Sequence, residues 1–238
     1  METQINKITL GVSSCLLGEK VRFDSGHKKN QYLLNVLSRY FEFHPFCPEV
    51  AIGLGIPREP IRLVEKDNQV ICVGTKNTEL DVTKQLIEIA DEQQHWQQQI
   101  AGYILKKDSP SCGMERVKLY KTQMPERIGV GIYARRLMEN FPHLPIEEEG
   151  RLNDLAIREN FIQRVYIYAR WQSLQQHPLT LNILQQFHAQ HKYICMSHNQ
   201  LATKALGALL ANNTPVANIA ELAARYLKQL MQLLKTMA

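Results

Sequence analysis

The chain has 238 residues, of which 45% are hydrophobic and 21% are charged, and this length suits one or two globular domains. The apolar content excludes collagen-like and disordered chains, and no apolar run reaches the ~20 residues that a membrane-spanning helix requires. The acidic start and the short apolar segment after it are unlike a signal peptide, so we expect a cytoplasmic protein without a membrane partner.

The net charge of +5 is distributed unevenly along the chain. Residues 1–150 carry 19 basic and 20 acidic side chains, whereas residues 151–238 carry 9 and 3. A moderately basic helical segment is typically a solvated surface. It contains no aromatic platform or recognition-helix pattern, so we do not expect nucleic-acid binding.

Short apolar runs and helical patterns alternate in the first 107 residues. The predicted elements are a strand at 7–12, a helix at 30–40, a strand at 41–46, a hairpin at 61–64 and 70–73, a helix at 80–99 and a strand at 102–107. This alternation is typical of an α/β domain with a mainly parallel sheet flanked by helices, a Rossmann-like three-layer arrangement.

After Pro145 the chain is predicted to be almost entirely helical, with helices at 154–175, 179–197, 201–212 and from 219 onward. We therefore expect a first domain at 1–172 and a small all-α domain at 178–238. The last helix repeats apolar residues every three or four positions. Its apolar face must pack on neighbouring helices or on another chain, since such a helix is marginal alone.

Five cysteines at long spacings, an odd number in a reducing compartment, argue against disulfides. Cys72 lies in an apolar strand and Cys195 in a helix, where a free thiol usually behaves as a small buried hydrophobe. Cys15, Cys47 and Cys112 each follow a predicted strand instead. Because the carboxyl ends of parallel strands share one edge of a sheet, we expect these three thiols to converge.

Three convergent thiols indicate a metal site with an open position, a thiol nucleophile or burial. No pair has the C-x-x-C spacing of a structural zinc site. A cubane iron–sulfur cluster would leave one iron without a protein ligand, free to act as a Lewis acid. Catalytic zinc and a thiol nucleophile are the alternatives. If Pro48 opens a helical turn, Cys47 lies at its positive end, which stabilises a thiolate.

Polar side chains near these cysteines suggest further roles. Glu49 could deprotonate water, and Ser109 and Ser111 could hydrogen-bond the reacting group. Alternatively, Glu49 complements a helix N-terminus and the serines cap a loop. Cations near the same loops could bind a phosphate or lie on the surface, and they are Arg22, His27, Lys28, Arg58, Lys106 and Lys107.

Five long motifs occur in order along the chain: GVSSCLLGEKVRFD at 11–24, GHK at 26–28, CPEVAIGLGIPREP at 47–60, GYILKKDSPSCGM at 102–114 and EEGRLND at 148–154. They resemble the motifs of the thiouracil desulfurase (TudS) family. From about Phe187 the chain resembles the YbgA-type domain that is fused to this family in many bacteria. That domain continues through further helices, so we expect residues 178–238 to be a partial copy of it.

The resemblance implies a [4Fe-4S] cluster on Cys15, Cys47 and Cys112, whose fourth iron binds the exocyclic sulfur of a thiolated pyrimidine. It also implies that Glu49 activates the attacking water, that Ser109 takes part in the chemistry, and that sulfur leaves as hydrosulfide without net redox change. The implied substrates are 2-thiouracil and 4-thiouridine monophosphate. Residues expected to contact the substrate are Ser14, Arg22, His27, Lys28, Lys106 and Ser111.

A second hypothesis is an iron–sulfur or thiol-based sensor or adaptor protein that acts through its basic helical tail. It depends on the charge of residues 180–238 and on the apolar face of the last helix. It predicts self-association, a protein partner or salt-sensitive nucleic-acid binding that depends on residues 180–238.

Overall fold

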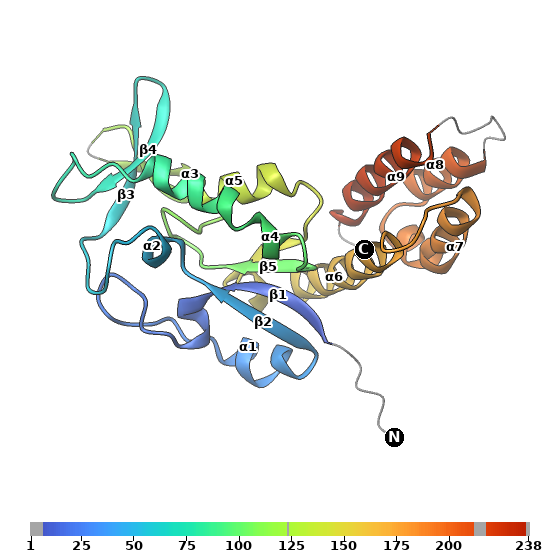
Figure 1. Ribbon diagram of the computed structural model, residues 1–238, viewed down its shortest axis with the longest axis horizontal. Helices are drawn as coiled ribbons and strands as arrows, with labels where there is room; N and C mark the ends of the chain where they lie inside the picture. Colours follow the sequence, from blue (N-terminus) through green and yellow to red (C-terminus); the bar gives the residue numbers. More distant parts are fainter. Residues whose placement is uncertain (1–6, 123, 212–217, 237–238) are drawn as a thin grey trace. The chain divides into compact units, whose positions relative to one another are not determined.

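The computed structural model describes residues 7–122, 124–211 and 218–236 (Figure 1). The chain divides into two compact units, residues 1–153 and residues 154–238. Helix α6 (Leu155–Leu174) belongs to the second unit. The predicted domain boundary between residues 172 and 178 therefore falls at the end of this helix, and it stays a prediction.

The first unit is built on a four-stranded parallel sheet, which we call sheet A. Its strands run in the order β2-β1-β5-β8, and all three pairings are parallel. Of the two central strands, β5 is buried along its whole length and β1 from Leu10 onward, as expected for strands covered on both faces. The strands are β1 (Ile8–Ser13), β2 (Phe41–Phe46), β5 (Gly102–Leu105) and β8 (Ile146–Glu148). This sheet confirms the predicted α/β class.

Helices flank sheet A on both sides. In Figure 1, α3 (Thr83–Glu92), α4 (Gln94–Gln97) and α5 (Ile132–Asn140) lie above the strands, and α1 (Gln31–Asn35) lies below them. Aromatic rings fill the space between α4 and β2, where Trp96 stacks on His44 with ring centroids 4.1 Å apart. Gly11 is required beneath this cluster, because a Cβ atom there would lie 2.5 Å from the ring of Tyr103.

Two predicted helices are interrupted. The helix expected at 30–40 consists of α1 and the short 3-10 turn η2 (Leu37–Arg39), and the one expected at 80–99 breaks between α3 and α4. At the second break, the Gln93 side chain accepts a hydrogen bond from Trp96 Nε1 at 2.8 Å. That bond satisfies the indole N–H of a ring that packs against the sheet, so tertiary packing overrides the helical pattern.

A second sheet, sheet B, has the order β4-β3-β6-β7. It contains the predicted hairpin, formed by β3 (Ile61–Lys66) and β4 (Gln69–Gly74), together with β6 (Val117–Tyr120) and β7 (Pro125–Gly129). Strands β6 and β7, helix α5 and strand β8 were not predicted. The predicted helices after Pro145 begin at residue 154, and β8 lies before them in a stretch where no element was predicted, because three residues are too few to show a period.

The second unit contains α6, α7 (Leu181–His198), α8 (Gln200–Ala211) and α9 (Ile219–Leu234), which confirms the four predicted helices. The expected end of the third helix, residue 212, lies outside the described residues. Tyr226, Leu230 and Leu234 of α9 are fully buried in the core of this unit. The apolar face of α9 is therefore covered by helices of its own unit, and this face no longer supports the sensor or adaptor hypothesis.

The two cysteines predicted to be buried hydrophobes have no exposed surface. Cys72 lies in β4 and Cys195 in α7. None of the helices in the described residues combines the length and the apolar character that crossing a membrane requires.

Candidate active site at the carboxyl edge of sheet A

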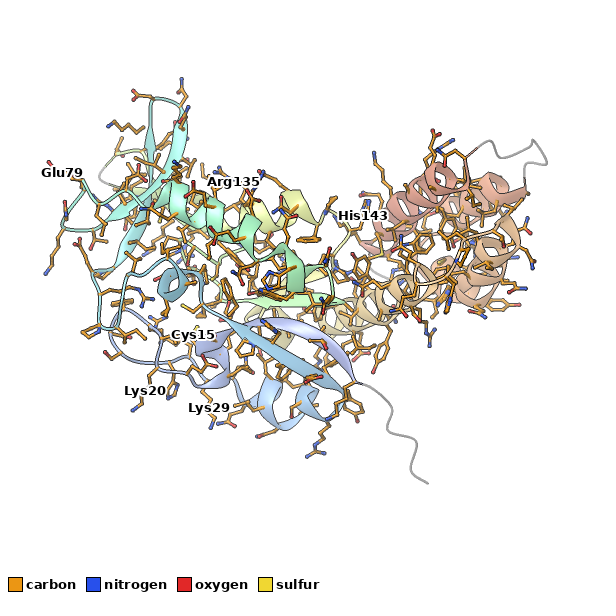
Figure 2. The ribbon with its side chains drawn as sticks, viewed as in Figure 1. Cys15, Lys20, Lys29, Glu79, Arg135 and His143 are labelled. Atoms are coloured by element: carbon orange, nitrogen blue, oxygen red, sulfur yellow. The ribbon has the colours of Figure 1, made fainter. Side chains whose placement is uncertain are left out.

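Cys15, Cys47 and Cys112 meet at the carboxyl edge of sheet A, as predicted. Cys15 lies in the turn η1 (Ser14–Leu17) after β1, Cys47 directly follows β2, and Cys112 lies in the loop after β5. All three thiols are free and line one cavity of about 880 Å³. Figure 2 shows Cys15 beyond the end of β1, with Lys20 and Lys29 on the segment that follows it.

Backbone hydrogen bonds fix the loops that carry these cysteines. The Lys28 N–H donates to the Cys15 carbonyl at 2.8 Å, which folds the segment after β1 back onto the turn. At the start of α5, the N–H groups of Ile132 and Ala134 donate to the carbonyls of Pro110 and Ser111, both at 3.0 Å. A helix N-terminus has free N–H groups, so the unpredicted helix α5 anchors the Cys112 loop.

Burial disfavours ionisation of the three thiols. It raises the pKa of Cys15 to about 11 and that of Cys112 further, and neighbouring Cys47 raises both. Cys47 is the N-cap of α2 (Pro48–Ala51), as the Pro48 prediction implies, and N–H groups of this turn lower its pKa. Burial has the larger effect, so the pKa of Cys47 is raised as well. The three thiols therefore need a bound cation to become thiolates together.

In the described part of the chain, no three or more His, Cys, Asp and Glu side chains are grouped as ligands of a single metal ion. Two thiolates on one zinc ion lie at most about 4.6 Å apart, since each Zn–S bond is about 2.3 Å long. An iron–sulfur cluster binds each thiolate to a different iron and so takes ligands that are farther apart. Three free thiols on one cavity are a donor set that fits such a cluster.

Glu49, in the first turn of α2, is held through both carboxylate oxygens. Its Oε2 accepts hydrogen bonds from Arg58 Nε at 3.0 Å and Nη2 at 2.7 Å, and its Oε1 accepts one from Ser111 Oγ at 2.6 Å. Ser111 Oγ lies 2.9 Å from Ser109 Oγ, which accepts the Cys112 N–H at 3.1 Å. A continuous chain of hydrogen bonds thus runs from Arg58 to the backbone of Cys112.

The structure separates the two predicted serines. Ser109 lines the cavity together with Glu49 and Ser14. Ser111 is fully buried, and it is absent from the cavity wall. Its hydroxyl bridges Glu49 and Ser109 instead, so a direct contact between Ser111 and a substrate would require this bridge to open. The alternative of loop capping holds for Ser109, which caps the N–H of Cys112.

The family model described as 2-thiouracil desulfurase matches residues 10–149, which is more than half of the chain. The chain belongs to the 2-thiouracil desulfurase family. This confirms the resemblance found in the motifs and identifies the chain as a member of an enzyme family. A second family model, described as a protein of unknown function (DUF1722), matches residues 192–238.

Two individual proteins are similar to this member of the desulfurase family. Uncharacterized protein YbbK of Bacillus subtilis (strain 168) is 30% identical over 150 residues, which cover 60% of this chain and 97% of that protein. The solved structure of the [4Fe-4S]-dependent thiouracil desulfidase TudS is 31% identical and covers 64% of this chain and 98% of its own, with a TM-score of 0.52.

In this member of the desulfurase family, the cations of the cavity differ in their partners. Lys106 Nζ lies 2.5 Å from Glu149 Oε1, and both side chains are largely buried. Arg58 pairs with Glu49. By contrast, Lys28 and Lys107 line the cavity without an ion pair among the described residues. Arg22 and His27, which were also predicted to bind substrate, line the same cavity.

The pairing of Lys106 with Glu149 was not predicted. Glu149 directly follows β8, and its Oε2 also accepts the Lys107 N–H at 2.8 Å. The motif at 148–154 contains this residue, but only the pairing of β8 with β5 places it beside a lysine that precedes it by 43 positions. The acidic run at 147–149 is the one sequence signal that could have pointed to it.

Proposed function

We propose that the chain hydrolyses the carbon–sulfur double bond of a thiolated pyrimidine, 2-thiouracil or 4-thiouridine monophosphate. One water is consumed, the oxo form and hydrosulfide are produced, and no net oxidation or reduction occurs. The observation that carries this proposal is that three free thiols, Glu49 and Ser109 line one cavity in a member of the 2-thiouracil desulfurase family.

Cys15, Cys47 and Cys112 would hold a [4Fe-4S] cluster, the cofactor on which the related desulfidase depends. When bound, the cluster supplies an iron that lacks a protein ligand and serves as a Lewis acid for the thione sulfur. Because burial keeps the three thiols protonated, they release protons when they become ligands. Cluster loading is therefore favoured as the pH rises.

Glu49 would accept a proton from the attacking water. An ionised carboxylate accepts hydrogen bonds and can take up a proton, as a general base must. Ser109 Oγ already accepts the Cys112 N–H, so its own proton is available for donation. That proton can go to Ser111 or to a substrate atom in the cavity. Glu49 and Ser109 thus supply an acceptor and a donor on the same wall.

The remaining cations favour a substrate with a phosphate. Lys28 and Lys107 line the cavity without an ion pair in the described part of the chain. Arg22 Nε lies 3.5 Å from Asp24 Oδ1, but this buried atom makes no hydrogen bond among the described residues. A phosphate monoester presents several strong acceptor oxygens to such groups. Lys106 is neutralised by Glu149 and suits the uncharged carbonyl oxygen of a pyrimidine instead. The proposal therefore favours 4-thiouridine monophosphate over the free base.

Anaerobic purification with iron and sulfide quantitation tests the proposal. The protein should be brown, contain about four irons per chain and release hydrosulfide from 4-thiouridine monophosphate. Cys15→Ala, Cys47→Ala and Cys112→Ala should each remove the colour and the turnover. Cys195→Ala is the matched control, since this buried thiol belongs to the second unit, and it should keep both. Colourless wild-type protein with full activity would refute the proposal.

A further inference from the structure

The two oxygens of the Glu49 carboxylate have different partners. Oε2 receives both hydrogen bonds from Arg58, whereas Oε1 receives the single one from Ser111. A guanidinium commonly binds a carboxylate with one donor to each oxygen. Here both donors go to one oxygen, so Oε1 stays on the side of the serine hydroxyls.

Arg58 is itself fixed by the backbone on the far side of its guanidinium. Nη1 donates to the Gly55 carbonyl and Nη2 to the Val21 carbonyl, both at 2.9 Å. Its side chain is 5% exposed. The carbonyl of Val21 also lies 3.9 Å from Cys47 Sγ, so Arg58 and one of the three cavity thiols contact the same peptide group.

We propose that Arg58 and Ser111 are positioning residues. Each binds one carboxylate oxygen of Glu49, and together they keep Glu49 in the orientation that the proposed hydrolysis needs. This inference depends on the proposed function, in which Glu49 is the base. Arg58 binds Oε2. Ser111 binds Oε1, and the same Ser111 hydroxyl links this oxygen to Ser109. Neither residue needs to touch the substrate, since each acts through Glu49.

The hydrogen bonds from Arg58 and Ser111 prevent the Glu49 side chain from rotating freely. A glutamate has three rotatable side-chain bonds, and an unanchored Glu49 would occupy several rotamers. A displacement of about 1 Å in a reacting group can lower the rate by about 100-fold. Loss of the Arg58 anchor should therefore lower kcat and leave KM nearly unchanged, because the cavity that binds substrate keeps its other residues.

A double-mutant cycle separates this role from a general structural one. Arg58→Gln should lower kcat by about 10- to 100-fold, and Arg58→Lys should restore part of the loss, since lysine keeps the charge without the planar fork. In the Glu49→Gln background, Arg58→Gln should cause no further loss beyond about two-fold, because the residue through which it acts is already gone. A crystal structure of the Arg58→Gln protein should show the Glu49 carboxylate displaced from Ser111.

Arg136→Gln is the matched control, because Arg136 makes a similar two-donor pair with Asp91 that lies outside the cavity wall. It should leave kcat unchanged. Iron content is measured for every variant, and if Arg58→Gln fails to retain iron, the cycle is run with Arg58→Lys. Wild-type kcat in the Arg58 variant, or additive losses in the double variant, would refute this inference and leave the proposed function standing. Full activity of Glu49→Gln would instead refute the proposed role of Glu49.

Discussion

Lys28 and Lys106 line the same cavity, and among the described residues Lys106 pairs with a carboxylate whereas Lys28 makes no ion pair. An uncompensated ammonium group gains more from a phosphate than a neutralised one does. Lys28→Met should therefore raise KM for 4-thiouridine monophosphate by about 10-fold, the effect of one lost hydrogen bond to a charged group, and leave KM for 2-thiouracil unchanged. Steady-state kinetics with both substrates measure this difference.

Lys84→Met serves as the control for that prediction, because Lys84 lies on α3 and its side chain is 86% exposed. It should change neither KM. An equal rise of KM for both substrates in Lys28→Met would show that Lys28 does not contact a phosphate.

At the residue scale, the sequence alone was sufficient to predict the site residues that lie in the loops after the strands. Cys15, Cys47 and Cys112 could be grouped because parallel strands deliver them to one edge. Their polar partners could not be assigned in this way. Ser111 and Glu49 are 62 positions apart, and no local pattern indicates that a serine hydroxyl will contact that carboxylate rather than a substrate.

At the element scale, length decided what could be predicted. The four helices of the second unit have at least 12 residues each, long enough to show an apolar period. Strands β6, β7 and β8 have three to five residues, and charged side chains interrupt them. The equally short β5 could be predicted because it is an unbroken apolar run. The unpredicted strands matter for the site, since β8 brings Glu149 to Lys106.

Helix α7 carries a buried histidine whose titration should affect stability. His191 Nδ1 lies 2.7 Å from the Phe187 carbonyl and Nε2 lies 3.1 Å from Arg170 Nη1, a pattern that suits a neutral ring with its proton on Nδ1. Burial lowers the pKa of His191, the hydrogen bond to the Phe187 carbonyl partly opposes this, and the charge of Arg170 lowers the pKa as well. Burial lowers the pKa of His188 on the same helix as well.

The free energy of unfolding of the second unit should therefore decrease as the pH falls below about 6.5, the pKa of an unfolded histidine. In that range the unfolded chain binds protons that the folded helices do not, so protonation favours unfolding. Urea unfolding at several pH values between 5 and 8 measures this slope, roughly across the histidine range. His191→Gln should lower stability near neutral pH and show a weaker dependence on pH. Equal slopes in both proteins would contradict the assignment.

At the scale of the whole molecule, the cavity and the excess charge lie in different units. Every residue that lines the cavity lies between Ser13 and Asn153, within the first unit, whereas residues 151–238 carry the basic excess. The second unit has its own core, in which the apolar face of α9 is already buried. All the roles proposed for the chemistry are therefore assigned to side chains of the first unit.

A chain shortened to residues 1–154 should accordingly fold, bind iron and turn over 2-thiouracil within about three-fold of the full chain, since it keeps every described residue of the cavity wall. Circular dichroism, iron content and kcat measure these three properties. If the shortened protein folds but lacks iron, helices of the second unit contribute to cluster retention. If it holds iron but loses turnover only on the nucleotide, the basic unit acts on the phosphate-bearing substrate, and the charge asymmetry of the chain serves recognition.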